Sequence, residues 1–229
     1  MKPIFYLIAG ANGSGKTTLG HELLDKEKEL IYLNADELAA KMDDKIGISA
    51  GKIIHTNLKE VISSRKSFVW ESTISGNHHI GILEKARKAE YEIVFVYIFL
   101  DSPDVNLARI KKRVALGGHD VPASDVIRRF YKSMKNFSVA AGLVDRWKLF
   151  YNGDDNFELV AEGNKRNIEI LNDDLCKKLD AQVTGMHLLD SKNSRLVIQA
   201  QSGIHCIQAI NNNRVINKMD LGLRRYNGK

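Results

Sequence analysis

The chain has 229 residues, of which 44% are hydrophobic and 27% are charged, and its formal net charge is +6. This length and hydrophobic content exclude a globally disordered chain and favour one large domain with room for a small appendage. The two cysteines, Cys176 and Cys206, exclude a disulfide framework, and no stretch approaches the ~18 consecutive apolar residues of a membrane span. We therefore expect a cytoplasmic protein with no membrane partner.

An apolar run at residues 4–9 leads without a break into a glycine-rich loop. A lysine followed by an apolar run imitates a secretory signal, but cleavage after it would destroy the loop, so we expect a buried first strand. Residues 8–20 read IAGANGSGKTTLG and satisfy the phosphate-loop pattern G-x-x-x-x-G-K-[ST]. A helical pattern at 17–28 follows and completes the strand–loop–helix context that the motif requires.

The loop predicts a binding site for ATP and Mg²⁺. Its glycines allow backbone N–H groups to turn toward phosphate oxygens, and the following helix adds its positive N-terminal end. Lys16 would reach the β- and γ-phosphates, and the Thr17 hydroxyl would bind Mg²⁺. A chance match in a glycine-rich turn is the alternative, which the flanking strand and helix disfavour. The expected nucleotide-binding residues are Gly10, Ala11, Asn12, Gly13, Ser14, Gly15, Lys16, Thr17 and Thr18.

Strand and helix patterns alternate along the chain to about residue 179. Apolar or alternating runs predict strands at 31–34, 67–71, 92–100, 147–151 and 157–161. Apolar residues at helical spacing predict helices at 50–65, 76–89, 104–116, 123–138 and 164–179. This alternation implies an α/β fold of the P-loop NTPase class, with a doubly wound, mostly parallel sheet and helices on both faces.

The regular pattern weakens after the last predicted helix. We expect residues 1–180 to form the α/β domain and residues 181–229 to form a small C-terminal appendage of unknown role. The appendage holds one alternating run, at 195–201, and seven basic residues against two acidic ones. Such an excess indicates either a solvated surface or a contact with nucleic acid, and the first is the more common case.

An acidic residue lies at or just after the end of the second, third and fourth predicted strands. In open parallel sheets the ligand lies outside the carboxyl ends of the strands. We therefore expect Asp36, Glu71 and Asp101 to lie near the phosphate loop. An acid at this place can accept the proton of an attacking hydroxyl group or organise Mg²⁺ and water.

Each of these acids also has a structural interpretation. Asp36 could cap the helix that follows it, although we favour a catalytic role. Glu71 could be tied to Ser72 and Thr73 rather than to a ligand. Asp101 precedes Ser-Pro-Asp, a helix-start signature that favours capping, while a role as a Mg²⁺ ligand stays open.

The segment 109–135 is strongly basic. It contains eight basic and two acidic residues, namely Arg109, Lys111, Lys112, Arg113, Arg128, Arg129, Lys132 and Lys135 against Asp120 and Asp125. A glycine-containing break, GGHD, separates two predicted helices that both carry arginines. This arrangement predicts a helical lid. Arginines there would stabilise a phosphoryl group in transfer, and a solvated helical face is the alternative. Within the break, we expect His119 to be an exposed loop residue and a substrate contact rather than a catalyst.

The loop also resembles that of ABC-type ATPases, but the rest of the chain excludes that class. Those proteins need an LSGGQ-like signature and a later apolar strand that ends in Asp-Glu. The nearest match, ALGGHD at 115–120, lacks the serine and the glutamine, and no such strand follows it.

In order along the chain, the motifs GANGSGKTT, NADE, FVWEST, ARIKKRVALGGHDVP and VIRRF resemble the zeta toxin family of P-loop kinases over about residues 3–163. The resemblance is closest to the bacterial branch often labelled predicted ABC-type ATPases. Zeta toxins use ATP to phosphorylate the 3′-hydroxyl of the amino sugar in UDP-N-acetylglucosamine, which blocks cell-wall precursor synthesis, and a small antitoxin restrains them. The resemblance thus implies a toxin that phosphorylates a small-molecule acceptor, a nucleotide sugar, with an antitoxin as partner.

The resemblance also implies roles for single residues. It assigns the catalytic base to Asp36 and an acidic substrate-site residue to Glu71, with Thr73 beside it. The two catalytic arginines of the family correspond to Arg113 and to either Arg128 or Arg129. The expected catalytic residues are thus Lys16, Asp36, Arg113, Arg128 and Arg129, the expected substrate contacts are Glu71, Thr73, Arg109 and His119, and the expected metal ligands are Thr17 and Asp101.

Other proteins would share these parts. A nucleotide, nucleoside or antibiotic kinase would have the same loop, base and lid, and a polynucleotide end kinase would also use the basic lid and tail. A different class is an ATP-binding regulatory switch with little turnover. Such a switch has no need of a base at the end of the second strand.

Overall fold

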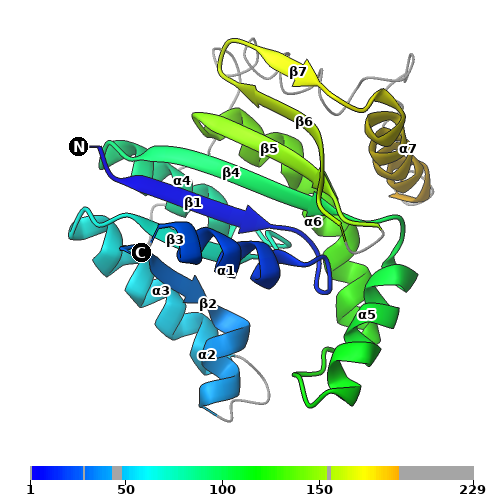
Figure 1. Ribbon diagram of the computed structural model, residues 1–229, viewed down its shortest axis with the longest axis horizontal. Helices are drawn as coiled ribbons and strands as arrows, with labels where there is room; N and C mark the ends of the chain where they lie inside the picture. Colours follow the sequence, from blue (N-terminus) through cyan, green and yellow to red (C-terminus); the bar gives the residue numbers. More distant parts are fainter. Residues whose placement is uncertain (1, 28, 43–47, 154–155, 191–229) are drawn as a thin grey trace, which may run out of the picture.

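The computed structural model of the chain describes residues 2–27, 29–42, 48–153 and 156–190. At its centre is a seven-stranded sheet in the order β2-β3-β1-β4-β5-β6-β7 (Figure 1). The strands are β1 (Ile4–Ala9), β2 (Ile31–Asn34), β3 (Phe68–Ser72), β4 (Glu92–Phe99), β5 (Arg146–Tyr151), β6 (Glu158–Asn164) and β7 (Ile168–Ile170). The helices are α1 (Lys16–Lys26), α2 (Ala35–Lys41), α3 (Ile48–Ser63), α4 (His78–Lys88), α5 (Pro103–Ala115), α6 (Ala123–Leu143) and α7 (Asp173–Asp190). Within the described residues, no helix combines the length and the apolar character that crossing a membrane requires.

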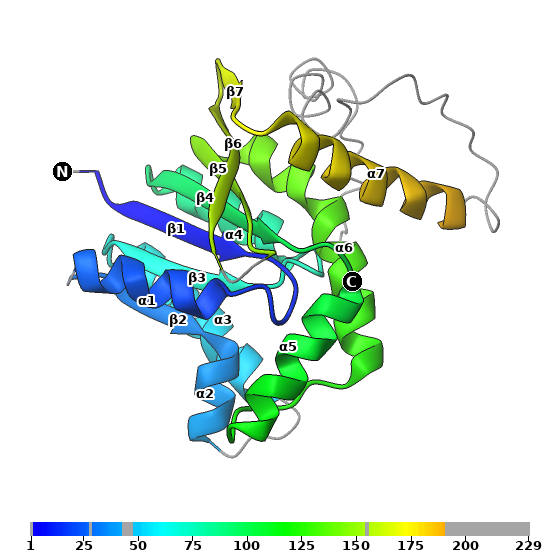
Figure 2. The same ribbon diagram turned by 45° about the vertical axis from the view of Figure 1, so that its right-hand side comes forward.

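The strand directions confirm the predicted sheet. β2, β3, β1, β4 and β5 are parallel to one another, and β6 and β7 are antiparallel additions at one edge. Side chains of successive residues point to opposite faces, so each strand divides its apolar residues between two cores. Phe5 and Leu7 of β1 belong to the core that α3, α4, α6 and α7 cover, whereas Ile8 belongs to the core against α1. Helices therefore cover both faces, as Figure 2 shows, and β4 is buried from Ile93 to Phe99.

The predicted helix at 164–179 is wrong in its first half. β6 continues to Asn164, and β7 pairs with it in an antiparallel hairpin. The Asn164 side-chain oxygen accepts the backbone N–H groups of Arg166 at 2.7 Å and Asn167 at 3.1 Å, and these bonds close the hairpin turn. The helix begins only at Asp173, because the turn and the edge pairing override the apolar spacing that suggested a helix.

α7 continues past residue 180, so the boundary expected there falls inside a helix. From the part beyond that boundary, Gln182 donates to the backbone carbonyl groups of Leu100 and Asp101, directly after β4. The start of the expected appendage is thus joined to the end of a central strand. The alternating run at 195–201 lies outside the described residues, and the role of the appendage stays a prediction.

α5 and α6 form a helical hairpin that projects beyond the carboxyl ends of the central strands (Figure 2). Gly117 has φ 85°, a left-handed conformation that ends α5. Ile110 of α5, Val121 of the connection and Val126 of α6 pack into a small apolar core of their own. This shared core joins the two arms of the predicted lid into one unit.

A buried histidine in α4 affects how the stability of the fold depends on pH. His79 is 1% exposed, and its Nδ1–H group donates to the Gly76 carbonyl oxygen at 2.7 Å. Its Nε2 atom has no hydrogen-bond partner among the described residues. Burial lowers the pKa of His79 below its usual value. The folded protein therefore resists protonation at His79, whereas the unfolded chain takes up a proton there below about pH 6.5.

We expect acid to destabilise the wild-type protein more than a His79→Asn variant, whose amide can replace Nδ1–H as the donor to Gly76. Because the unfolded chain binds more protons, the free energy of unfolding should fall between about pH 7.5 and about pH 5.5, with at most about 1.4 kcal/mol per pH unit from this residue. Urea unfolding followed by circular dichroism at both pH values measures the two losses. Equal losses would show that His79 accepts its proton without unfolding.

Candidate functional site

The phosphate loop lies between β1 and α1, and glycines occupy its two tightest positions. Gly10 has φ 149°, and a Cβ atom there would lie 2.3 Å from the carbonyl oxygen of Ile98 in β4. Gly15 has φ 97°, and a Cβ atom there would lie 2.5 Å from Nδ2 of Asn152. No side chain fits at either position, so the loop packs directly against the ends of β4 and β5.

Two buried asparagines hold the loop in this conformation. Asn106 in α5 donates through Nδ2 to the carbonyl oxygen of Asn12 at 2.6 Å. Asn152, directly after β5, donates through Nδ2 to the carbonyl oxygen of Ser14 at 2.9 Å. Buried hydrogen bonds of this kind are costly to break, so these two asparagines stabilise this loop conformation.

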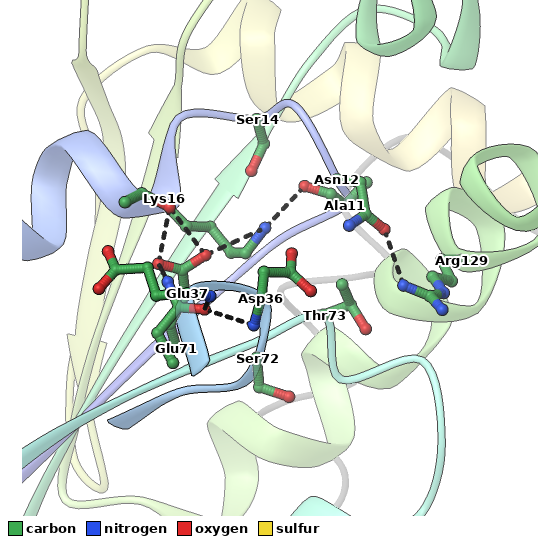
Figure 3. A network of polar contacts seen from close by, with 12 residues as sticks. Ala11, Asn12, Ser14, Lys16, Asp36, Glu37, Glu71, Ser72, Thr73 and Arg129 are labelled. Atoms are coloured by element: carbon green, nitrogen blue, oxygen red, sulfur yellow. Dashed lines mark hydrogen bonds and ion pairs between the residues drawn. The ribbon is translucent and has the colours of Figure 1, made fainter. Parts of the chain in front are cut away.

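A buried carboxylate, Glu71, lies at the centre of the polar network beside the loop (Figure 3). The Thr17 hydroxyl lies 3.1 and 2.9 Å from its two oxygens, and Lys16 Nζ lies 3.8 Å from Oε1. The Tyr32 hydroxyl and Asn34 Nδ2 donate to Oε2 at 2.6 and 2.8 Å. The parallel pairing of β2 with β3 aligns Asn34 with Glu71 and so brings these groups together. The buried charge is thus satisfied by four side chains from two elements, α1 and β2.

The contacts of Glu71 differ from the structural role considered for it, in which Ser72 and Thr73 would bind its carboxylate. Thr73 shares a hydrogen bond with Ser75 at 3.0 Å, and Ser72 accepts the N–H group of Ile74 at 3.1 Å. Neither of these two hydroxyl groups is bound to Glu71 in the contacts described. Glu71 instead faces the phosphate loop through Lys16 and Thr17, and its predicted role as a substrate contact stays a prediction.

The Thr17 hydroxyl and the Glu71 carboxylate suit a magnesium ion. Mg²⁺ prefers oxygen ligands and is usually bound through one or two protein groups plus phosphates and water. In P-loop proteins the loop Ser or Thr and an acid at a strand end supply these groups. The 2.9 Å contact between Thr17 and Glu71 places both oxygen ligands at one point beside the loop.

Asp101 does not join this group. Its carboxylate accepts the Tyr151 hydroxyl at 2.5 Å and forms an ion pair with Lys178 of α7. The residue at the cap position of α5 is Ser102, whose side chain makes no capping hydrogen bond. The structure therefore supports neither predicted role of Asp101, as a cap or as a Mg²⁺ ligand, because its charge is used to attach α7.

Asp36 is the second residue of α2, and the cap of this helix is Asn34. The Asn34 side-chain oxygen accepts the N–H groups of Asp36 at 2.9 Å and Glu37 at 3.3 Å. The alternative that Asp36 caps the helix is therefore wrong. Figure 3 shows the Asp36 side chain between those of Lys16 and Thr73, and these three residues line one cavity.

Two adjoining cavities open around these residues. The first, of about 550 Å³, is bordered by the loop, α5 and the residues after β5. The second, of about 630 Å³, is bordered by α3, the end of β3 and the start of α6. Both volumes suit small-molecule ligands. The residues that line both cavities are Lys16, Asn34, Asp36, Glu71 and His119.

The second cavity has a polar and aromatic wall. His55 Nδ1 and His78 Nε2 lie 2.7 Å apart, at hydrogen-bond distance, and Trp70 packs edge-on against the His78 ring. Burial lowers the pKa of both histidines, and the charges of Lys59 and Lys85 act in the same direction, as does that of His78 on His55. Both rings are therefore neutral near pH 7. The same cavity is lined by the hydroxyl-bearing residues Ser72, Thr73 and Ser75.

Arg109 and Arg113 of α5 line the first cavity. Arg109 donates through Nη2 to the carbonyl oxygen of Gly153 at 3.0 Å, and Arg113 donates through Nη2 to that of His119 at 2.6 Å. His119 belongs to the break between the two lid helices and lines both cavities. The lid thus brings two cations and an imidazole to the first cavity.

Of the adjacent arginines in α6, Arg129 lies nearer to the loop. Arg129 Nη1 donates to the side-chain oxygen of Asn12 at 3.3 Å, as Figure 3 shows, and its side chain is 29% exposed. The Arg128 side chain is 48% exposed and binds Asp125 at 2.8 Å. The hydrogen bond from Arg128 and the charge of Arg129 hold the pKa of Asp125 below its usual value. Of the two arginines, Arg129 is thus the one that reaches the phosphate loop.

The sequence does not single out several residues of this site. Tyr32 reads as an ordinary strand residue, Asn106 as part of an amphipathic helix, and Asn152 as part of a turn. His55 and His78 are far apart in the chain and show no motif. The signal for Asn152 is its position directly after a predicted parallel strand, whereas the others need the packed structure.

Asn152→Ala should weaken nucleotide binding and leave the fold intact. The change leaves the buried Ser14 carbonyl unpaired, which costs about 1–3 kcal/mol, so we expect affinity for the ATP analogue AMP-PNP to fall about fivefold or more. Calorimetric titration measures the affinity. Asn136→Ala is the matched control, because Asn136 makes the same kind of bond to the Ile74 carbonyl at 2.6 Å, away from the loop. Equal affinities in both variants would contradict the anchoring role.

Comparison with known proteins extends these observations. The model of the family described as Zeta toxin matches residues 1–165. A protein of Haemophilus influenzae is 33% identical over 138 residues, which cover 57% of this chain and 92% of that protein.

Two solved structures share the fold. A structure from the PezAT chromosomal toxin-antitoxin system of Streptococcus pneumoniae gives a TM-score of 0.55 at 15% identity and covers 96% of this chain and 88% of that one. The structure of AvrRxo1-ORF1:-ORF2 with ATP gives a TM-score of 0.65 at 14% identity and covers 87% of this chain and 66% of that one. The predicted P-loop NTPase class is thus confirmed, and together with the family match it supports a toxin-type P-loop kinase. Because the family model matches well over half of the chain, this protein belongs to the zeta toxin family.

Proposed function

We propose that the protein is an ATP-dependent kinase that transfers the γ-phosphoryl group of ATP to a hydroxyl group of a small molecule. The position of Asp36 carries this proposal, because Asp36 lines both cavities together with Lys16. A nucleotide in the first cavity and an acceptor in the second would meet at this border. An ATP-binding switch with little turnover would not need a carboxylate there.

On this proposal the first cavity holds Mg-ATP. The backbone N–H groups of the loop, Lys16 and the N-terminal end of α1 would bind the β- and γ-phosphates. Thr17 and Glu71 would hold Mg²⁺, which supplies positive charge to these phosphates when bound. Arg113 and Arg129 would offset the negative charge that spreads over the transferred group.

Asp36 acts on the acceptor. Its carboxylate orients the acceptor hydroxyl and takes its proton as the acceptor oxygen bonds to the γ-phosphorus. The bond from the γ-phosphorus to the bridging oxygen breaks, and ADP leaves with that electron pair. The proton then passes from Asp36 to water, which restores the carboxylate.

The wall of the second cavity favours a sugar as acceptor. Trp70, the neutral His55–His78 pair and three hydroxyl-bearing residues offer an aromatic surface and hydrogen bonds without a net charge. Membership of the zeta toxin family directs the proposal to a nucleotide sugar, UDP-N-acetylglucosamine, and to an antitoxin protein as partner. A nucleotide, nucleoside or antibiotic kinase is the second candidate, because the same loop, base and lid would serve it.

The test is incubation of the protein with γ-labelled ATP and Mg²⁺ in the presence of a panel of acceptors. The panel contains UDP-sugars, nucleosides, aminoglycosides and a short oligonucleotide. We expect label to move to a UDP-sugar and the product to keep its diphosphate. Label on another acceptor would reassign the substrate, and ATP binding without transfer to any acceptor would favour the switch.

Asp36→Asn should slow phosphoryl transfer by about 10²–10⁴-fold, because the amide keeps the shape of the side chain but cannot take the proton. Affinity for AMP-PNP should stay close to that of the wild type. Single-turnover kinetics with the accepted sugar and calorimetric titration measure the two quantities. Asp104→Asn is the matched control, since Asp104 is the exposed second residue of α5 and lines neither cavity. A rate for Asp36→Asn equal to that of the control would remove the base from the mechanism.

Arg129→Ala should reduce the transfer rate more than Arg128→Ala, because only Arg129 is bonded to the phosphate loop in this structure. Loss of one preorganised cation at a developing charge lowers the rate by about 10²–10³-fold. Both variants lose an ion pair to Asp125, so the pair controls for that effect. The opposite ranking of the two rates would assign the role to Arg128.

A further inference from the structure

A glycine in the middle of α1 makes room for a tyrosine of the neighbouring strand. A Cβ atom on Gly20 would lie 3.0 Å from both Cε2 and the hydroxyl oxygen of Tyr32. Glycine weakens a helix relative to alanine, so its presence here trades helix stability for this close approach. The His21 ring lies on the same side, with its centroid 5.3 Å from that of Tyr32. The Tyr32 ring is thus held in one place against α1.

The Tyr32 hydroxyl is directed at Glu71. It donates to Glu71 Oε2 at 2.6 Å, and Asn34 Nδ2 donates to the same oxygen at 2.8 Å. A phenol keeps its proton near neutral pH, so Tyr32 is the donor in this bond. Two uncharged donors from β2 therefore fix one carboxylate oxygen, while Thr17 lies within hydrogen-bond distance of both.

We propose that Tyr32 is a positioning residue for magnesium, which acts by holding Glu71 in the orientation that directs the Thr17 hydroxyl toward the metal. The proposal rests on the Mg-ATP site of the proposed function. Because the Thr17 hydroxyl donates its hydrogen bond to Glu71, its oxygen would present a lone pair to the ion. Partners that orient the ligands of a metal typically change its affinity by about 10- to 100-fold when removed. Tyr32 touches neither ATP nor the acceptor on this account.

The test measures binding rather than turnover. AMP-PNP is titrated into the wild type and Tyr32→Phe, first with EDTA and then at increasing Mg²⁺ concentrations. We expect the metal-free affinity to agree within about twofold, since phenylalanine fills the same space, and the half-saturating Mg²⁺ concentration to rise about 10-fold or more. Tyr6→Phe is the matched control, because Tyr6 in β1 donates to Glu27 at 2.9 Å outside both cavities.

A second variant tests the hydrogen bond between Tyr32 and Glu71 by changing α1 instead of the tyrosine. Gly20→Ala should displace the Tyr32 ring and raise the Mg²⁺ requirement in the same direction as Tyr32→Phe. Gly81→Ala is its control, because a Cβ atom on Gly81 in α4 meets nothing within 4 Å. Circular dichroism confirms that each variant is folded before titration.

The outcomes separate the two proposals. A Mg²⁺ requirement of Tyr32→Phe equal to that of Tyr6→Phe overturns the role of Tyr32, whatever the protein phosphorylates. A wild type that binds Mg-AMP-PNP but transfers phosphate to no acceptor overturns the proposed function, while the shift in Tyr32→Phe still supports the role of Tyr32. A wild type whose AMP-PNP affinity does not depend on Mg²⁺ overturns the magnesium site and the role of Tyr32 together.

Discussion

The buried charge of Glu71 is the constraint on which the rest of the site depends. A carboxylate inside a protein is stable only when opposite charge and hydrogen-bond donors surround it. Lys16 and Thr17 of the phosphate loop supply part of this surrounding, and Tyr32 and Asn34 of β2 supply the rest. The loop, β2 and β3 are therefore joined at one point. Since Asn34 also caps α2, the same point sets the start of the helix that carries Asp36.

Much of the fold could be predicted because its signals are local. The buried run of β4, the phosphate loop and the helical spacing after it each lie within a short stretch of chain. The hairpin of β6 and β7 was missed because its turn and edge pairing override the apolar spacing, as at Ile168. α7 continues beyond residue 180 through contacts with Asp101 and Leu100, which no pattern within the helix itself reveals.

The candidate site also contains residues that could be predicted from the sequence and residues that could not. Residues at the carboxyl ends of parallel strands, such as Asp36 and Glu71, could be found because their position follows from the topology. The partners of those residues could not, because each contact joins separate elements. Tyr32 faces Glu71 only through the register of β2 on β3 and the space left by Gly20. Asp101 was assigned to the site by the same positional rule, yet α7 uses its charge for another purpose.

The central claim is that two ligands meet at Asp36, on the border between the two cavities. A crystal structure with Mg²⁺ and AMP-PNP tests it most directly. The account predicts that the γ-phosphate lies between Lys16 and Asp36, with the adenosine on the side of Arg109 and the second cavity left open. A nucleotide whose base or ribose fills the second cavity, or whose γ-phosphate lies away from Asp36, would contradict the account.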